Sequence, residues 1–367
     1  MKKLISPALL LAFIQFPGSA PAPGKSSAPL PVNKNLIIIT LDGFRWQEFF
    51  TGADSVLLHD AEYTQDVSTL RLLYWSPDPG ERRKKLMPFV WNVLAEKGQL
   101  FGNRLLGNRM NVSNRSMLSY PGYNEIFTGK TDPRIISNRK LRNPNIHVLE
   151  YLESQPGFAG QVAVFSSWDA FPFILDDQRN GVYINSGYQA ITGDDVSPVH
   201  AAVNRLQERG EKEKTATRHD MLTFLAAREY LSKQQPRVLY LALGETDEAA
   251  HDGRYDIYLE KANQADKMIA EIWHWVQTTA GYRDNTSLVI TTDHGRGARP
   301  GKWTSHGTFI SGSAQTWLAI MGPGISPAGE INEPSQHYQA QLAQTISALL
   351  GEDFAGQYGS AAPVSLR

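Results

Sequence analysis

Residues 36–43 read LIIITLDG, a continuous apolar and β-branched run that ends in an aspartate and a glycine. Two later stretches have the same form: residues 238–247 read VLYLALGETD, and residues 287–295 read SLVITTDHG. Unbroken apolar runs of this length, without polar alternation, predict central strands of a parallel sheet that is covered on both faces. Residues 161–165 and 317–321 are further strand candidates.

Helical patterns lie between these runs. Four stretches carry apolar residues at helical spacing, and two of them stop at a glycine: residues 87–97, 220–232, 255–279 and 336–350. Strands that alternate with helices predict a doubly wound α/β fold, with a mostly parallel central sheet and helices on both faces.

The predicted domain boundaries follow from this alternation. The catalytic domain is expected to span residues 35–352, and residues 353–367 form a C-terminal tail. Residues 51–86 and 166–218 do not fit a simple strand-helix repeat, so they are interpreted as insertions over the sheet edge or the active site.

The N-terminal segment has the features of an export signal. Lys2 and Lys3 precede an apolar stretch over residues 4–16, and small residues follow. Residues 1–22 are therefore predicted to be a signal peptide and residues 23–34 a disordered leader, which indicates a periplasmic or secreted protein. An uncleaved N-terminal anchor is the alternative, and no other segment has the length of a membrane span.

Composition limits the chemistry. The 367 residues include 36 basic and 37 acidic side chains, a net charge of -1, so no electrostatic argument favours a nucleic-acid polymer. Cysteine is absent, which excludes thiolate ligands and a cysteine nucleophile. Any metal must be held by His, Asp, Glu or a hydroxyl group.

Each of the three central strands is followed by an aspartate: Asp42, Asp247 and Asp293. Because parallel strands present their carboxyl ends at one edge of a sheet, these carboxylates are expected to converge. Converging carboxylates repel one another unless cations neutralise them. His251 follows Asp247 by one helical turn, His294 follows Asp293 directly, and His306 lies in a nearby glycine-flanked loop. Three Asp and three His residues suit two divalent metal ions.

Each of these aspartates and histidines, taken alone, has an ordinary structural explanation, such as a helix cap or a surface histidine. A hydroxyl group completes the set. Residues 119–129 read SYPGYNEIFTG, which places Ser119 at the start of a predicted helix, where free N–H groups favour an anion. A plain helix cap is the alternative role of Ser119, and Ser113 and Ser116 are rival hydroxyls.

In this order the motifs resemble the alkaline phosphatase superfamily, and within it most closely the nucleotide pyrophosphatase/phosphodiesterase branch. The resemblance rests on residues 41–45 (LDGFR), 87–103 (MPFVWNVLAEKGQLFGN), the SYPGYNEIFTG turn, D-x-x-x-H, DHG and HG. It extends from about residue 35 to residue 323.

The resemblance implies a two-metal phosphate ester hydrolase with Ser119 as its nucleophile. It implies one metal ion on Asp247, His251 and His306, and another on Asp42, Asp293, His294 and the Ser119 oxygen, with zinc as the expected metal at both sites. The family has an asparagine three residues after the nucleophile, where this chain has Gly122. Asn124 is the expected substitute as a phosphate contact, and Tyr120 is a candidate to stack on the substrate.

Several alternatives remain open. Relatives that cleave monoesters carry a Lys-x-Arg pair that residues 165–169 lack, so a phosphodiester or pyrophosphate substrate is favoured over a phosphomonoesterase or phosphotransferase activity. A sulfatase would need arginine where Tyr123 stands. A non-catalytic binding protein is disfavoured because the full ligand set is present. The expected partner is a small phosphate ester, and neither its identity nor the oligomeric state follows from the sequence.

Overall fold

The computed structural model describes residues 32–193, 196–209 and 216–367. The predicted signal peptide and residues 23–31 of the predicted leader lie outside these ranges. Of the remaining leader residues, Asn33 is buried, and its amide donates hydrogen bonds to Ser287 Oγ at 2.9 Å and to the carbonyl of Pro323 at 3.3 Å.

A sheet of eight strands forms the centre of the described structure, in the order β10-β2-β9-β7-β1-β6-β4-β5. Its strands are β1 (Asn35–Leu41), β2 (Gly98–Phe101), β4 (Val162–Ser166), β5 (Tyr183–Ser186), β6 (Val238–Leu243), β7 (Thr286–Thr291), β9 (Leu318–Met321) and β10 (Gly329–Glu330). Neighbours pair in parallel, except that β9 runs antiparallel to β7 and β2. The predicted mostly parallel sheet is confirmed.

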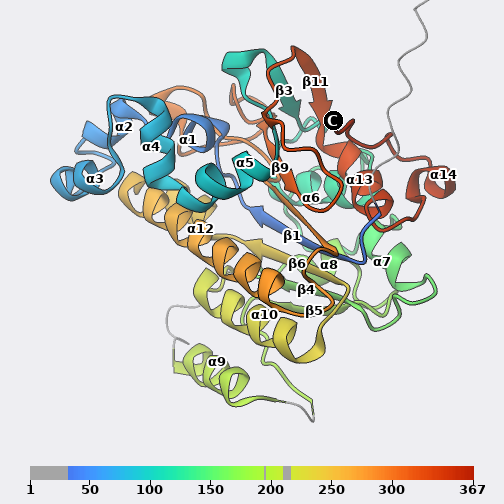
Figure 1. Cartoon of the computed structure of the whole chain (residues 1–367). Helices are drawn as coiled ribbons and strands as arrows, with labels where there is room; N and C mark the ends of the chain where they lie inside the picture. Colours follow the sequence, from blue (N-terminus) through green and yellow to red (C-terminus); the bar gives the residue numbers. More distant parts are fainter. Residues whose placement is uncertain (1–31, 194–195, 210–215) are drawn as a thin grey trace, which may run out of the picture.

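Helices cover both faces of this sheet (Figure 1). They are α1 (Trp46–Thr51), α2 (Ser55–His59), α3 (Val67–Tyr74), α4 (Pro79–Leu86), α5 (Ala95–Lys97), α6 (Ser119–Thr128), α7 (Val148–Glu153), α8 (Phe171–Ile174), α9 (Pro198–Arg209), α10 (Asp220–Gln234), α11 (Glu245–His251), α12 (Tyr255–Thr278), α13 (Leu342–Ala348) and α14 (Phe354–Tyr358). Within the described residues, no helix combines the length and the apolar character that crossing a bilayer requires.

Burial on both faces explains the unbroken apolar run of β1. Ile37 and Ile39 belong to a core packed against α10 and α12, whereas Leu36 and Ile38 belong to a second core packed against α6, α7 and α13. Successive side chains of a strand point to opposite faces, so a strand buried on both sides has no polar face. The predicted α/β class with helices on both faces is therefore confirmed.

The helix predicted over residues 336–350 is wrong in its first part. Residues Ser335–Tyr338 form β11, which pairs in parallel with β3 (Asn108–Asn111). β3 also pairs with β8 (Gln315–Thr316), so these strands form a second, small sheet. A turn of 3-10 helix follows β11, and α13 begins only at Leu342. Pairing with a strand more than 200 residues earlier in the chain overrode the local helical pattern.

The predicted insertions have definite places in the structure. Residues 51–86 include α2, α3 and α4, which contact α12. Residues 166–218 supply the edge strand β5 and, in their described part, helix α9. The predicted C-terminal tail carries α14 and packs on the domain, with Phe354 and Val364 buried.

Candidate metal centre

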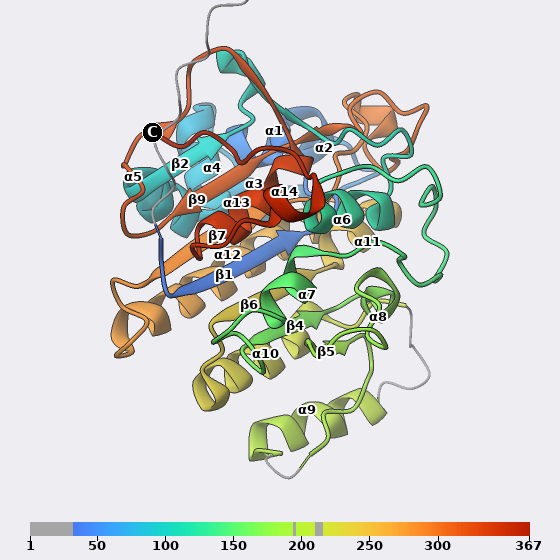
Figure 2. The same cartoon turned by 90° about the vertical axis from the view of Figure 1, so that its right-hand side faces the viewer.

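The carboxyl ends of β1, β6 and β7 meet at one edge of the sheet, since these strands are parallel neighbours. Figure 2 shows the arrowhead of β1 directed toward α6 and α11. Asp42 directly follows β1, Asp293 lies two residues after β7, and Asp247 lies in α11, which follows β6. Asp293 Oδ1 accepts a hydrogen bond of 3.1 Å from the backbone N–H of Gly43. The three predicted carboxylates therefore converge, as strand polarity requires.

Asp42, Asp293 and His294 form the first cluster of candidate ligands. Their ligand atoms lie within 4.8 Å of one another. His294 Nε2 is 3.5 Å from Asp42 Oδ1 and 3.6 Å from Asp293 Oδ2. All three side chains are buried. This is the set predicted for the metal ion beside the nucleophile.

Asp247, His251 and His306 form the second cluster. His251 Nε2 lies 3.1 Å from Asp247 Oδ2 and 3.1 Å from His306 Nε2, and His306 Nε2 is 3.9 Å from Asp247 Oδ1. Asp247 and His251 reach this position together because they are one turn apart on α11. The rings of His294 and His306 stack with their centroids 3.9 Å apart, so the two clusters adjoin.

Ser119 lines the same cavity as Asp42, Asp247 and His251. It is the first residue of α6, whose early proline, Pro121, is pre-organised for a first helical turn. The Ser119 side chain is buried, and its Oγ lies 3.2 Å from His294 Nε2. All six predicted Asp and His ligands and the predicted nucleophile are thus brought to one place.

Hydrogen bonds fix which ring nitrogen of two histidines faces the centre. His294 Nδ1 lies 2.9 Å from the carbonyl of Gly295, and His306 Nδ1 lies 3.0 Å from the carbonyl of Met117. Because a carbonyl only accepts, each Nδ1 carries the proton and each Nε2 presents a lone pair. Ligand histidines are commonly oriented by such a bond at the other ring nitrogen. His294 Nε2 can therefore accept the hydrogen bond from the Ser119 hydroxyl.

Burial shifts every buried titratable group of the first cluster toward its neutral form. Burial, followed by the charge of Asp293, holds the pKa of Asp42 well above its usual value. Burial also raises the pKa of Asp293 to about 7 and lowers the pKa of His294. Asp42 Oδ1 and Asp293 Oδ2 accept no hydrogen bond from any described residue. Buried carboxylate oxygens without donors are costly, and divalent cations would satisfy them. The residues present therefore fit a metal centre.

The sequence analysis missed Arg296, which enters the second cluster. Its guanidinium donates to Asp247 Oδ1 and to the carbonyl of Trp303, and it is buried. Burial lowers the pKa of Arg296 to about 9. Its position two residues after His294 was the available signal, but arginine is not a metal ligand and drew no prediction.

The expected substrate contacts from α6 are not where the sequence suggested. Asn124 Nδ2 donates to the carbonyl of Lys130, and Asn124 Oδ1 accepts from Asn143 at 3.1 Å. The hydroxyl of Tyr120 donates to the carbonyl of Leu141 at 2.6 Å. Both side chains are buried among these partners, which argues against the direct substrate contact expected for either.

The departure at Gly122 has a steric cause. A Cβ atom at this position would lie 2.3 Å from the carbonyl oxygen of Asp293. Residue 122 therefore faces the backbone of a candidate ligand, and only glycine fits without movement.

A cavity of about 170 Å³ opens beside the two clusters. Its lining residues come from both clusters, α6, and the segments after β4 and β6: Asp42, Ser119, Asn138, Trp168, Thr217, Gly244, Asp247, Glu248 and His251. Asn138, which the sequence analysis did not single out, accepts a hydrogen bond from the backbone N–H of Tyr120 at 3.0 Å.

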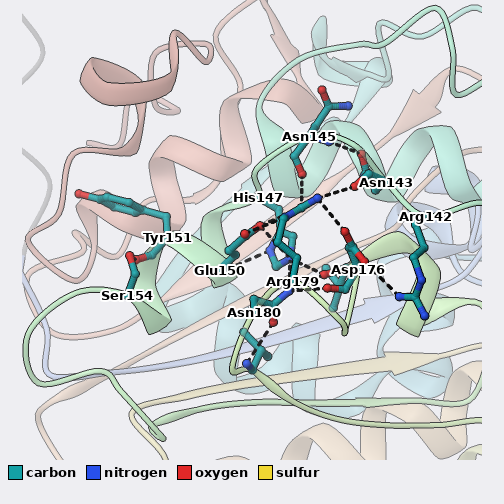
Figure 3. A network of polar contacts seen from close by, with 12 residues as sticks. Arg142, Asn143, Asn145, His147, Glu150, Tyr151, Ser154, Asp176, Arg179 and Asn180 are labelled. Atoms are coloured by element: carbon teal, nitrogen blue, oxygen red, sulfur yellow. Dashed lines mark hydrogen bonds and ion pairs between the residues drawn. The ribbon is translucent and has the colours of Figure 1, made fainter.

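A polar network holds the loop that carries this asparagine (Figure 3). Arg179 donates to the carbonyls of Asn143 and Asn145 at 2.8 and 2.7 Å, at the end of the loop. The same guanidinium pairs with Glu150 of α7 and with Asp176. These bonds join the loop to α7 and to the segment after α8, so they fix the position of the loop that forms one wall of the cavity.

Comparisons with known proteins agree with this geometry. Residues 203–310 match the family model of the Metalloenzyme superfamily, and this segment carries five of the predicted ligands, Asp247, His251, Asp293, His294 and His306. No curated protein sequence matches the chain.

Solved structures resemble the whole domain at low sequence identity. The wild-type alkaline phosphatase PafA is 12% identical, with a TM-score of 0.59 over 92% of this chain and 99% of the other. A phosphonate monoester hydrolase of Agrobacterium radiobacter is 14% identical (TM-score 0.53, 91% and 79%). The lipoteichoic acid synthase LtaP of Listeria monocytogenes is 13% identical (TM-score 0.54, 88% and 73%).

The chain therefore has the fold of the alkaline phosphatase superfamily, and its ligand-bearing segment matches the Metalloenzyme superfamily. The resemblance predicted from the motifs is confirmed at this level. The narrower likeness to the nucleotide pyrophosphatase/phosphodiesterase branch stays a prediction.

Proposed function

We propose that this protein is a two-metal hydrolase that cleaves a phosphodiester through a phosphoserine intermediate at Ser119. The observation that carries the proposal is the position of Ser119 Oγ, 3.2 Å from the unprotonated Nε2 of His294 and beside both ligand clusters. A hydroxyl that served only as a helix cap would have no reason to lie against a candidate metal ligand.

The residues of the two clusters would hold the metal ions as the resemblance implies: Asp42, Asp293, His294 and Ser119 on one, and Asp247, His251 and His306 on the other. Nitrogen and carboxylate oxygen donors without sulfur suit zinc at a catalytic site. Bound divalent ions would lower the pKa of the serine hydroxyl and neutralise charge on the phosphoryl oxygens.

The protein's own side chains then have distinct roles in the two steps of the reaction. The Ser119 hydroxyl gives up its proton to solvent, and its Oγ attacks phosphorus. The bond from phosphorus to one ester oxygen breaks, and that alcohol departs after taking a proton from water. In the second step water attacks phosphorus, the bond from phosphorus to Ser119 Oγ breaks, the serine oxygen takes up a proton, and the product leaves as a phosphate monoester. The start of α6 places its positive dipole end beside the anion, and the Asn138 side chain lines the same cavity.

Two observations favour a diester over the alternatives. None of the described residues that line the cavity is lysine or arginine, so no side-chain cation is placed for the second charge of a monoester. Trp168 occupies the wall after β4 instead. For a sulfatase, the position that needs arginine holds Tyr123, which is buried and donates to Asp42 Oδ2 at 3.2 Å.

The direct test combines metal analysis with one substitution. Purified protein is expected to contain two equivalents of zinc and to hydrolyse bis-p-nitrophenyl phosphate. Ser119→Ala should lower kcat by about 10³-fold or more. Ser116→Ala, which removes a rival hydroxyl nearby in sequence, should retain activity. Undiminished hydrolysis by Ser119→Ala would show that this mechanism is wrong.

Export is also part of the proposal. The basic, apolar and small-residue pattern of residues 1–22 supports a periplasmic or secreted location. Fractionation of cells that express the full chain, with N-terminal sequencing of the mature protein, tests it. Cytoplasmic protein with residues 1–22 intact would contradict export.

A further inference from the structure

One wall of the cavity consists of Trp168, Thr217 and Glu248. The backbone N–H of Trp168 donates to Ser166 Oγ at 3.1 Å, and Ser166 Oγ donates to the carbonyl of Trp168 at 3.0 Å, which fixes the turn after β4. Trp168 packs against the buried core on one side and lines the cavity on another. Its side chain therefore lies between the core and the cavity.

Thr217 connects the tryptophan to the carboxylate. Trp168 and Thr217 form an antiparallel β-bridge, so their backbones are in direct contact. Thr217 Oγ1 donates to Glu248 Oε1 at 2.7 Å. Glu248 lies on α11 next to Asp247 and is exposed. An aromatic side chain and an oriented carboxylate thus line the same cavity as Ser119.

The charge of Glu248 has no cationic partner among the described residues. Within residues 32–193, 196–209 and 216–367, no ion pair includes Glu248, and no lysine or arginine lines the cavity. Lys140, in the loop near Trp168, is paired with Asp169 at 2.6 Å. Asp42 and Asp247 belong to the clusters whose charge bound cations would offset, whereas Glu248 is in neither cluster. This wall therefore carries a negative charge and a π-face.

A π-face beside a carboxylate favours a cation over a neutral group. The face of an aromatic ring attracts quaternary ammonium groups, and a nearby carboxylate adds a Coulombic attraction. A free phosphate end would instead meet the repulsion of Glu248. The cavity, at about 170 Å³, is also smaller than the roughly 300–1,000 Å³ of sites that enclose drug-sized ligands. Its size suits a compact alcohol better than a nucleoside.

We propose that the diester carries a small, positively charged alcohol of the choline type, bound by the face of Trp168 and the carboxylate of Glu248. This inference rests on the proposed function and names its substrate class. Trp168 and Glu248 are then the residues that determine specificity, while Ser119 and the ligand clusters perform the chemistry.

The test compares esters that share a leaving group. The probes are p-nitrophenyl phosphorylcholine, its neutral 3,3-dimethylbutyl counterpart of nearly equal shape, and thymidine 5′-p-nitrophenyl phosphate. With the zinc-loaded protein, kcat/KM for the choline ester should exceed that for the neutral ester by about tenfold or more. Thymidine should be the poorest of the three.

Substitutions at two positions test whether Trp168 and Glu248 cause this preference. Trp168→Ala should lower kcat/KM for the choline ester by about tenfold, while Trp168→Phe should retain part of it. Glu248→Gln should lower it by about fivefold and lower the ratio of kcat/KM between the choline ester and the neutral ester by a similar factor. Glu96→Gln removes an equal charge from exposed α5, outside the cavity, and should change nothing. Binding of phosphocholine, measured by calorimetry, should weaken in parallel.

The outcomes separate the two proposals. Hydrolysis of bis-p-nitrophenyl phosphate with equal kcat/KM for the charged and neutral esters, or with a preference for thymidine, would overturn the inference and leave the proposed function standing. If the zinc-loaded protein cleaves none of the diesters, both are overturned.

Discussion

Substituting alanine at Gly122 probes the contact between the nucleophile helix and the candidate metal centre. The added Cβ would lie 2.3 Å from the carbonyl oxygen of Asp293 and 3.0 Å from its carbonyl carbon. Ordinary van der Waals contact begins at 3.4 Å, so α6 and the segment after β7 must separate by about 1 Å. Ser119 is one turn away on α6, and His294 follows Asp293 directly. The separation therefore acts on the distance between Ser119 Oγ and His294 Nε2.

A displacement of about 1 Å between reacting groups costs roughly 10²-fold in rate. The cost in stability is smaller, because overpacking of about 1–3 kcal/mol is partly offset by about 1 kcal/mol of better helix propensity. Gly122→Ala is thus expected to remain folded and to lose about two orders of magnitude in kcat/KM.

The assay is hydrolysis of bis-p-nitrophenyl phosphate at matched zinc content, with thermal unfolding measured on the same samples. Gly181→Ala is the matched control, because its Cβ would meet the Glu153 side chain at ordinary distances, with Oε1 nearest at 3.5 Å. Activity of Gly122→Ala within twofold of wild type would refute the reasoning. So would a loss of activity that unfolding accounts for in full.

Three further predictions concern stability. Removal of divalent metal ions with a chelator should lower Tm, because Asp42 and Asp293 then repel one another without compensation. A metal ion at 100 times its Kd adds about 2.7 kcal/mol to the free energy of unfolding. An unchanged Tm in scanning calorimetry would contradict the proposed metal centre. Burial raises the pKa of Asp266 to about 7, so the folded protein keeps a proton that the unfolded chain releases above about pH 4. Wild type should therefore gain about 2–3 kcal/mol of stability relative to Asp266→Asn as pH falls from 8 to 5 in urea unfolding, and parallel pH profiles would refute this. Asp220→Ala should lower the free energy of unfolding by about 3 kcal/mol or more, because Asp220 accepts hydrogen bonds from Ser167 Oγ and from two backbone N–H groups at the start of α11. A decrease of less than about 1 kcal/mol would contradict that role.

The convergence of the carboxylates was predictable because it depends on strand polarity alone. Once three apolar runs are read as parallel strands, their carboxyl ends must share an edge, and the residues that follow must be close. The one-turn spacing of Asp247 and His251 was equally local. Ser119 followed from a helix start that the sequence marks with Pro121.

Other features were hidden because their partners are remote. The local pattern around residues 335–338 predicts a helix, but in the folded chain these residues pair with β3 as a strand. Asn124 has a polar side chain near the nucleophile, yet Lys130 and Asn143 take up its hydrogen bonds. The wall of Trp168 and Glu248 joins residues 80 positions apart in the sequence through a single bridge at Thr217, which no local pattern marks.

The sequence by itself determined the fold class, the strand-end carboxylates and the ligand types, because hydrophobic periodicity and strand direction are properties of short segments. Only the tertiary structure decided which side chains face the centre. In the folded chain Arg296 donates a hydrogen bond to Asp247, and the side chains of Asn124 and Tyr120 bond to buried backbone carbonyls. At position 122 only glycine fits against the backbone of Asp293. Side-chain direction depends on which distant donors, acceptors and backbone atoms occupy the space around each residue, and that is fixed only when the whole chain has packed.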